Sequence, residues 1–456
     1  MGSYRARVGH AKEIDIQSAS VGFVGNPIAF LWTTLPPPVT GDSDTAPYVD
    51  PVAGVILLGG RTTVIALNDA QLAAAIAAAV PGRTIQLGAG AFNNNYSIAH
   101  NFPANNPLII KGAGGFGSVL NGNLTFGGAR NIVTGIDLSG ANVRIVIGGI
   151  NNKVIGCRVH GWGSVTTKSA VACTMAAGTF GEFAYNEIYS PGPWMPTTTT
   201  DQLRIGIRTA EGNSANNFHY DAWVHHCYFH DFPTKPIPGN YGSGQSDAIE
   251  VGQNAQNAFM HGIIAGWYIE YCLVSAHLGN DAIVDYKVGG ITTRYCTWSG
   301  NPGGRWDQRA GQQSVFESNW MDTSGGADVH GPLHRYIGNN VSPINILAGN
   351  VDCNAVAPQV THHRRACQAF VSGNSGVLNV GKAYAGFAQL PALNTAVEDH
   401  TPPGSVNLMA NQTGTIDNRN QASSVNFIAP VKLTPANVGP AAITNATAAY
   451  KAARGL

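Results

Sequence analysis

Two short stretches of the chain, WYIEYCLV at residues 267–274 and ITTRYCTW at residues 291–298, have the same pattern. The recurrent residues stand at the third, sixth and eighth positions, and the sixth is a cysteine in both. Six further copies, two of them looser, are NIVTGIDL (131–138), NKVIGCRV (152–159), GEFAYNEI (181–188), AWVHHCYF (222–229), SVFESNWM (314–321) and HRYIGNNV (334–341). A pattern that returns this often indicates an internal repeat.

The spacing of the repeat predicts the fold. The sixth positions are 21, 29, 41, 45, 24, 23 and 20 residues apart, and they are Ile136, Cys157, Asn186, Cys227, Cys272, Cys296, Asn319 and Asn339. A period of about 20–24 residues with insertions is typical of a solenoid. Strand-like segments, Gly and Asn turns and the lack of helical periodicity predict an all-β parallel β-helix, with coils about 4.8 Å apart. The insertions then become outer loops.

Four of the seven cysteines stand at the sixth position. Repeated inward Cys and Asn residues predict a ladder of reduced thiols and amides along the axis. Disulfides between adjacent coils are the alternative, and they require an oxidising history. A reactive, catalytic cysteine is the least favoured interpretation. The odd number of cysteines argues against a full disulfide framework, and the absence of a CxxC pair argues against structural zinc.

The two ends of the chain differ from the middle. Residues 61–380 are predicted to form the β-helix, after an N-terminal extension over residues 1–60. A short helix is expected near its start, capped by Asn68 or Asp69, with Leu72, Ile76 and Val80 as its apolar stripe. This helix would plug the first coil. Residues 381–456 are expected to cover the last coils.

Composition narrows the functional classes. Only 11% of the residues are charged, with 26 Lys and Arg against 26 Asp and Glu, so no global field attracts nucleic acid. No apolar run reaches membrane-spanning length. The first residues show no secretory signal, although extracellular, periplasmic or phage-virion localisation is the expectation. The oligomeric state is open.

Charged residues concentrate on one face of three successive coils. Asp285 and Lys287, Asp307 and Arg309, and Asp328 and His330 each stand two residues apart, and the second residue of each pair stands nine or ten residues before the sixth position. Residues at i and i+2 share one face of a strand, so stacking predicts one row of aspartates beside one row of cations. Such a face is either a solvated set of salt bridges or a groove for an anionic polymer. The low overall charge favours the groove.

Other residues are weaker candidates for the same groove. Arg204 and Arg208 lie four apart on a predicted strand and would extend its basic surface. His225 and His226 face opposite sides of a strand, so they do not easily share a metal ion; His226 is the one expected at the groove.

Three segments resemble the family-6 polysaccharide lyases, which include alginate lyases and chondroitinase B. They are SDAIEVGQ (246–253), DAIVDYKVGGITTRYCTWSG (281–300) and RWDQRAGQQSVFESNWM (305–321), in which ITTRYCTW is similar to the family's YRYNTF and RAGQ to its RHGN. The resemblance covers about residues 62–345. It implies a right-handed parallel β-helix that cleaves an alginate-like polymer by β-elimination at a uronic acid.

The resemblance also implies roles for individual residues. Lys287 would be the base that removes the C5 proton, and Arg309 would be the acid that assists or protonates the leaving C4 oxygen. A nearby cation such as Arg309 is expected to lower the pKa of Lys287. The predicted substrate-binding residues are His330, Asp307, Asp328, Arg204, Arg208, His226 and Arg305.

In the family a calcium ion neutralises the substrate carboxylate, and it is held by an Asn and a Glu-x-Glu pair. Asn280 and Ala282 stand at those positions here, so the Glu-x-Glu pair is missing. Glu250, Asp281 and Asp285 are the substitute candidates for calcium ligands. Arginine and histidine side chains are the alternative way to neutralise that carboxylate.

Two further functions stay open. A glycoside hydrolase of the phage-tailspike kind would use paired carboxylates, such as Asp285 with Asp307 or Asp247 with Glu250. A non-catalytic carbohydrate-binding solenoid would bind a polymer without a product. All three functions predict a polysaccharide partner.

Overall fold

The computed structural model describes most of the chain. The described residues are 61–103, 106–141, 144–167, 169–194, 203–209, 218–232, 245–252, 263–277, 282–299, 304–322, 325–349, 366–383 and 391–456, together with strands β1 (Arg5–Val8) and β2 (Lys12–Asp15). Strands β1 and β2 form an antiparallel pair. They are the described part of the predicted N-terminal extension.

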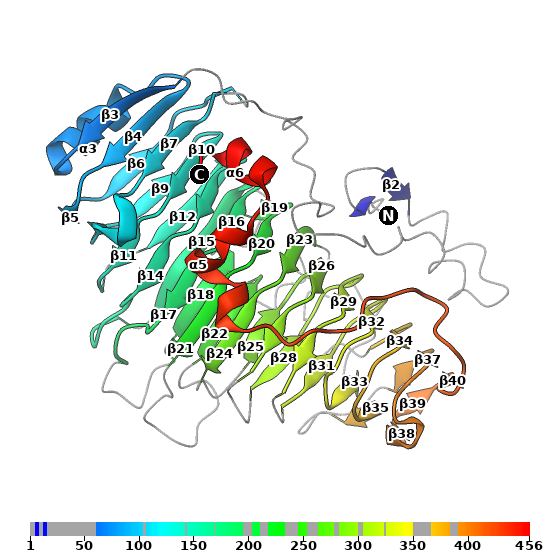
Figure 1. Ribbon diagram of the computed structural model, residues 1–456. Coiled ribbons are helices and arrows are strands. Elements are labelled where there is room, and N and C mark those ends of the chain that lie inside the picture. Colours follow the sequence, from blue (N-terminus) through cyan, green and yellow to red (C-terminus); the bar gives the residue numbers. More distant parts are fainter. Residues whose placement is uncertain are drawn as a thin grey trace.

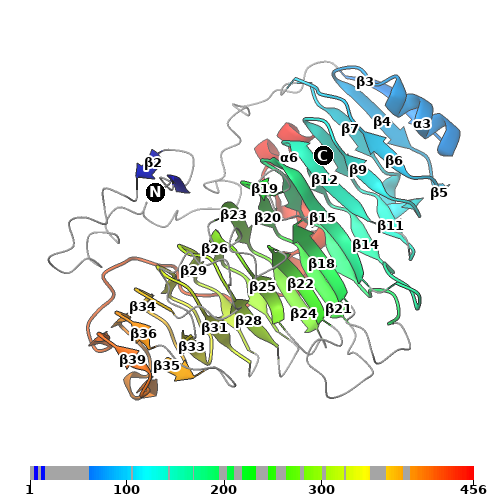
Figure 2. The same ribbon diagram turned by 180° about the vertical axis from the view of Figure 1, so that it is seen from behind.

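Three long parallel sheets run through the described chain, and successive coils add strands to them in turn (Figures 1 and 2). We call them sheets 1, 2 and 3. Within each sheet an inner strand pairs with a strand of the preceding coil and with one of the following coil, and sheet 2 ends at β30 (Trp320–Met321), before the last coils of sheets 1 and 3. The predicted parallel β-helix is therefore confirmed.

Sheet 1 contains β3 (Thr62–Ala66), β4 (Arg83–Leu87), β7 (Leu108–Lys111), β10 (Asn131–Thr134), β13 (Lys153–Ile155), β16 (Glu182–Ala184), β20 (Trp223–His225), β23 (Ile264–Glu270), β26 (Gly289–Arg294), β29 (Val315–Glu317), β32 (Arg335–Ile337), β34 (Phe370–Ser372), β37 (Ala396–Glu398) and β40 (Ile416–Asn418). Sheet 2 contains β5 (Gly90–Phe92), β8 (Ser118–Leu120), β11 (Asp137–Ser139), β14 (Arg158–His160), β17 (Glu187–Tyr189), β21 (Tyr228–Phe232), β24 (Leu273–His277), β27 (Thr297–Trp298) and β30 (Trp320–Met321).

Sheet 3 contains β6 (Tyr96–Ile98), β9 (Leu124–Phe126), β12 (Ile145–Ile150), β15 (Ser169–Thr179), β18 (Leu203–Thr209), β22 (Gln245–Val251), β25 (Ala282–Tyr286), β28 (Arg305–Gln308), β31 (Ala327–Val329), β33 (Ile344–Ala348), β35 (Leu378–Ala383) and β38 (Val406–Leu408), with β19 (His219–Tyr220) beside β15. Outside these sheets, β36 (Ala392–Leu393) pairs with β39 (Gln412–Thr413). Short 3-10 turns occur at Gly114–Phe116, Pro403–Ser405, Pro435–Asn437 and Ile443–Asn445.

The repeat defines the core and the turn between sheets 1 and 2. In NKVIGCRV the third, sixth and eighth residues are Val154, Cys157 and Val159, and all three are fully buried. The fifth residue, Gly156, has φ +63° and turns the chain from sheet 1 into sheet 2. Alternation along the strands and one left-handed turn residue per coil thus produce the coil shape.

The predicted ladder at the sixth position is confirmed. Asn319 Nδ2 donates to Asn339 Oδ1 at 2.9 Å, and Asn339 Nδ2 donates in turn to Asn374 Oδ1 at 2.9 Å. All four cysteines of the ladder are buried and free: Cys157, Cys227, Cys272 and Cys296. Burial raises the pKa of the Cys157 thiol to about 12, which disfavours a nucleophilic role.

Helix α3 (Asp69–Ala77) covers the first coil at the N-terminal end of the solenoid (Figure 1). Asn68 is its N-cap and accepts a hydrogen bond from the Gln71 amide at 3.0 Å. Leu72, Ala75 and Ile76 are the residues buried against the coils. Val80 was expected in this stripe, but it lies beyond the end of the helix and is 44% exposed.

The C-terminal part of the chain does more than cover the last coils. Strands β37, β38 and β40 extend sheets 1 and 3 beyond residue 380. The remainder, residues 419–456, is here called the C-terminal segment. It runs back over earlier coils through α5 (Gly439–Ala442) and α6 (Ala448–Arg454), in front of the coils in Figure 1 and behind them in Figure 2.

Candidate functional site

The outer face of sheet 3 carries one polar row across successive coils. The strand registers place Arg208 beside Glu250, Glu250 beside Asp285, Asp285 beside Asp307 and Asp307 beside Asp328. The predicted row of three aspartates is confirmed. Asn345 continues it, because it pairs with Asp328 and donates from Nδ2 to Asp328 Oδ1 at 2.8 Å. Sequence reasoning missed Asn345, since its coil has no charged residue at that position.

Lys287 lies at the centre of an ionic cluster, just past the end of β25. Its ammonium forms an ion pair with Glu250 and another with Asp285 Oδ2 at 3.1 Å. Arg309 from the next coil approaches Asp285 Oδ2 at 3.4 Å, and Arg208 from an earlier coil forms an ion pair with Glu250 Oε2 at 2.8 Å. These five residues are called the sheet 3 cluster. The structure thus brings Lys287 and Arg309 together on one carboxylate.

The pKa of Lys287 departs from the expectation. Burial alone lowers it and Arg309 adds to that, but the carboxylates of Asp285 and Glu250 outweigh both, so the pKa of Lys287 is raised. The pKa of Asp285 is lowered, because Arg309 and Lys287 together outweigh the cost of its burial. The prediction that Arg309 would leave the lysine partly neutral is therefore wrong for the ligand-free site. Two carboxylates win over one guanidinium.

The next two coils hold the remaining groove candidates. Asp307 accepts from Arg309 Nε at 3.3 Å and lies 3.6 Å from Arg305 Nε. His330 is buried, 3.8 Å from Asp307, and burial lowers its pKa, so it is neutral near pH 7. Arg305 and Arg309 are the most exposed of these side chains, at 22% and 14%. A ligand on sheet 3 therefore meets these two arginines first.

Arg204 does not line the groove as predicted. It shares the outer face of β18 with Arg208, but its side chain is fully buried. Its guanidinium donates to five backbone carbonyls, those of Ser164, Thr167, Gly192, Pro193 and Leu203. Arg204 therefore holds loops of two adjacent coils together.

His226 also does not lie at the groove, where it was predicted. It occupies the left-handed turn between sheets 1 and 2, with φ +50°, where its ring stacks between those of Tyr185 and Tyr271. It is the fifth residue of its repeat. The fifth residues of successive coils form a row at the turn between sheets 1 and 2, here called the turn row, and the side chain of His226 belongs to this row and not to sheet 3. Burial lowers its pKa.

A calcium ion does not fit the described carboxylates. Glu250 and Asp285 both bond Lys287, and each also faces an arginine, so a divalent cation would stand among three positive side chains. Within the described ranges, no three His, Cys, Asp or Glu residues gather as a metal-binding group. Asp281, the third candidate ligand, lies outside the described residues.

The described helices include none that is long and apolar enough to cross a membrane.

Comparison with known proteins supports the fold at low sequence identity. No protein-family model and no curated protein matches the sequence. Among solved structures, a PL6 family polysaccharide lyase of Pseudopedobacter saltans superposes with a TM-score of 0.61 and 15% identity, over 84% of this chain and 99% of that one. The PL6 family alginate lyase AlyGC superposes with a TM-score of 0.59 and 14% identity, over 82% and 54%.

A mannuronic acid specific family 6 lyase from human gut microbiota gives a TM-score of 0.57 and 12% identity, over 86% of this chain and 98% of that one. The resemblance to family-6 polysaccharide lyases seen in the sequence is thus confirmed as a resemblance in fold.

Proposed function

We propose that the protein is a polysaccharide lyase that cleaves a uronate-containing, alginate-like polymer by β-elimination. The observation that carries the proposal is the sheet 3 cluster, in which Lys287 and Arg309 from adjacent coils meet on Asp285. It stands on a fold whose similar structures include alginate lyases. A polymer of this kind is met outside the cytoplasm, so extracellular or periplasmic action is part of the proposal.

The proposed reaction assigns one step to each side chain. Lys287 Nζ, once deprotonated, removes the proton from C5 of the uronate. The electron pair of the C5–H bond forms the C4–C5 double bond, and the bond from C4 to the glycosidic oxygen breaks. Arg309 donates a hydrogen bond to the leaving oxygen, which takes a proton from solvent water to become a hydroxyl, and protonated Lys287 later returns the C5 proton to solvent.

The charge that develops on the uronate carboxylate during this step needs a cation. Arg305 and Arg309 are the partly exposed positive groups beside Lys287, and a guanidinium binds a carboxylate through two parallel hydrogen bonds. Asp307 lies between them and holds both in place. Because the pKa of Lys287 is raised, its free amine is scarce near neutral pH and becomes abundant only as the pH rises toward that pKa.

The electrostatics count against a glycoside hydrolase on the same face. Asp285 and Asp307 are in register on adjacent coils, close to the separation that a retaining enzyme uses. One of the two must be protonated at the start to act as the acid. Asp285 has a lowered pKa, and Asp307 faces Arg305 and Arg309. Asp285 is therefore held in its ionised form, and Asp307 is already engaged by two arginines.

The test is an ultraviolet scan with alginate and a panel of other acidic polysaccharides, each with and without a chelator. The expected result is an absorbance rise from a C4–C5 unsaturated uronide on alginate, unchanged by the chelator. New reducing ends without that absorbance would replace the proposal by hydrolysis. Binding without any product would replace it by a non-catalytic solenoid. Loss of the absorbance with the chelator alone would restore the calcium ion to the mechanism.

A further inference from the structure

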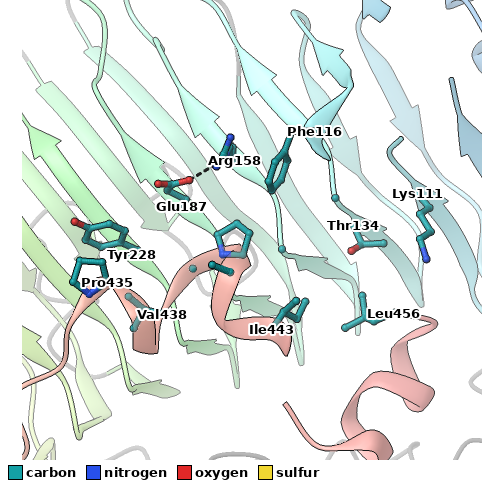
Figure 3. Close-up of a pocket in the computed structure, with 15 residues that line it drawn as sticks. Lys111, Phe116, Thr134, Arg158, Glu187, Tyr228, Pro435, Val438, Ile443 and Leu456 are labelled. Atoms are coloured by element: carbon teal, nitrogen blue, oxygen red, sulfur yellow. Dashed lines mark hydrogen bonds and ion pairs between the residues drawn. The ribbon is translucent and has the colours of Figure 1, made fainter. Parts of the chain in front are cut away.

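A cavity of about 470 Å³ lies away from sheet 3, where the C-terminal segment crosses the coils (Figure 3). The coils contribute residues of sheets 1 and 2 and of the turns between them to its wall. The C-terminal segment contributes Pro435, residues 438–441, Ile443 and Leu456. The volume of the cavity falls in the range of small-molecule sites, about 300–1,000 Å³.

The cavity exists because the turn row lacks side chains at this point. The fifth residue of the repeat is Gly135 and then Gly156 in the two coils here, whereas the next coils carry Tyr185 and His226. A Cβ on Gly156 would lie 3.2 Å from Ile443, but a Cβ on Gly135 would meet nothing within 4 Å. The C-terminal segment therefore closes the cavity at Gly156 and leaves it open at Gly135.

A second glycine pair on the same turn row shows what such a notch accepts. Gly338 and Gly373 also have left-handed φ values, and a Cβ on either would clash with the ring of Phe427. That ring belongs to the C-terminal segment. Two adjacent turn glycines in this solenoid thus form a seat for one six-membered ring. At Gly135 and Gly156 the seat holds no comparable ring among the described residues.

The walls of the cavity have two different chemistries. The C-terminal segment presents Val438, Pro440, Ile443 and Leu456, which are apolar. The coil side presents Lys111, and Arg158 with Glu187, whose ion pair measures 2.8 Å. The Arg158 guanidinium stacks on Phe116, 4.2 Å from the ring centre.

The charges do not balance within the cavity. Glu187 is engaged by Arg158, while Lys111 has no ion pair or side-chain hydrogen bond among the described residues. Figure 3 shows Lys111 and Arg158 on either side of Phe116. Among the charged side chains of the wall, the ammonium of Lys111 is therefore the one left for a ligand.

We infer that this cavity is a second, non-catalytic binding site for an anionic sugar unit. A pyranose ring has apolar C–H faces and polar edges, which match a glycine seat with one apolar wall and one polar wall. Its carboxylate would pair with Lys111. The choice of a uronate among anionic sugars rests on the proposed function. A second site would keep the polymer on the enzyme between cuts, since two linked contacts bind more tightly than one.

The experiment titrates the full-length protein with methyl β-D-glucuronide, which is too short to provide a polymer cut, and follows binding by saturation-transfer NMR. Methyl β-D-glucoside, which lacks the carboxylate, is the matched ligand. Lys111→Ala removes the charge, and Ala441→Trp fills the cavity from an exposed position of α5. Lys432→Ala, in the same C-terminal segment but outside the cavity, is the matched protein control.

Lys111→Ala and Ala441→Trp are each expected to weaken glucuronide binding at this site by about tenfold or more, the usual effect of losing a charged contact. Glucoside should bind the wild-type protein as weakly as glucuronide binds Lys111→Ala. Lys432→Ala should bind as the wild type does. Equal glucuronide binding by the wild type and both cavity variants would overturn the inference. Because the readout is binding, it stands or falls separately from the absorbance test of lyase activity.

Discussion

Two buried carboxylates, Glu182 on sheet 1 and Asp285 on sheet 3, are both surrounded by cations, but their surroundings are completed differently. Glu182 receives Lys153 at 2.8 Å and His225 at 3.3 Å from its own sheet, and Tyr450 and Arg454 at 2.8 Å each from α6. We call this set the Glu182 cluster. Every one of its contacts ties one piece of the fold to another.

Asp285 instead lies at a face that is not fully closed. Its Oδ1 atom is buried and has no hydrogen-bond partner among the described residues. Arg309 beside it and Arg454 beside Glu182 are equally exposed, each at 14% of the side chain. The difference lies in the carboxylates, because both oxygens of Glu182 are paired with side chains of the fold, whereas Asp285 Oδ1 is not hydrogen-bonded within the described part of the chain. The same residue types therefore serve stability in one place and, we propose, chemistry in the other.

The largest effect is expected from Lys287→Arg. Arginine keeps the positive charge between Glu250 and Asp285, so the fold is expected to survive, but a guanidinium stays protonated and cannot act as a base. Lyase activity should fall by about 10³-fold or more, within the range for loss of a general base. Steady-state absorbance assays and thermal melts of the purified variant would measure both properties.

Lys287→Ala is the companion variant, because it removes both the base and the charge. The assignment is wrong if Lys287→Arg retains near-normal turnover. If both variants unfolded, a loss of activity could not be assigned to the missing base rather than to the missing ion pairs of Lys287.

Glu182→Ala should have the reverse effect, a loss of stability without a loss of turnover. Removing the carboxylate breaks the buried ion pairs of Glu182 with Lys153 and Arg454, and breaking a buried pair in this way costs about 3–5 kcal/mol of the free energy of unfolding. Urea unfolding would measure the loss. The turnover of the folded fraction should be unchanged, because the cluster lies on sheet 1.

Glu182→Gln keeps a hydrogen-bond acceptor for Tyr450 and is the milder control. A loss of turnover without a loss of stability in Glu182→Ala would reverse the roles given to the two clusters.

The pH dependence separates the two clusters further. The pKa of Lys287 is raised by Asp285 and Glu250, so kcat/KM is expected to rise with pH across the alkaline range until it passes that pKa. Asp285→Asn removes one of the two carboxylates that raise it, so the rise should move to lower pH. Rate profiles of both proteins on the same substrate would show the shift.

As the pH rises, stability is expected to change in the opposite direction to activity. The ion pairs of protonated Lys287 stabilise the fold below the ordinary pKa of lysine, and that contribution is lost as the pH rises through the raised pKa. Stability should therefore decline where activity climbs. Identical rate profiles for the wild type and Asp285→Asn would remove Asp285 from control of the base.

The contrast between the clusters also shows what the sequence can reveal. The row Asp285, Asp307 and Asp328 was predictable because each residue lies at a nearly fixed distance before the sixth position of its repeat. The Glu182 cluster was not, because Tyr450 and Arg454 are 268 and 272 residues away in the chain. No periodicity relates a strand of the solenoid to a segment that runs back over it.

The predictions that were wrong, for Arg204, His226 and the pKa of Lys287, each have a local structural cause. Arg204 and Arg208 do share a face of β18, as alternation requires, but alternation does not show that loop carbonyls enclose Arg204. His226 stands at the fifth position, which the repeat uses for a turn. The pKa of Lys287 depended on Glu250, two coil positions away from Arg309, and the sum of those charges requires coordinates.

The smallest effect is expected from breaking an exposed ion pair. It tests whether the large effect on stability predicted for the Glu182 cluster comes from the burial of its charges or from ion pairing alone. Lys432 in the C-terminal segment pairs with Asp322, but its side chain is 52% exposed. Water already solvates both charges, so Lys432→Ala should change the free energy of unfolding by less than about 1 kcal/mol and leave turnover unchanged. Urea unfolding beside Glu182→Ala provides the comparison. A loss as large as that of Glu182→Ala would mean that anchoring the C-terminal segment, and not the burial of the charge, determines the stability of this fold.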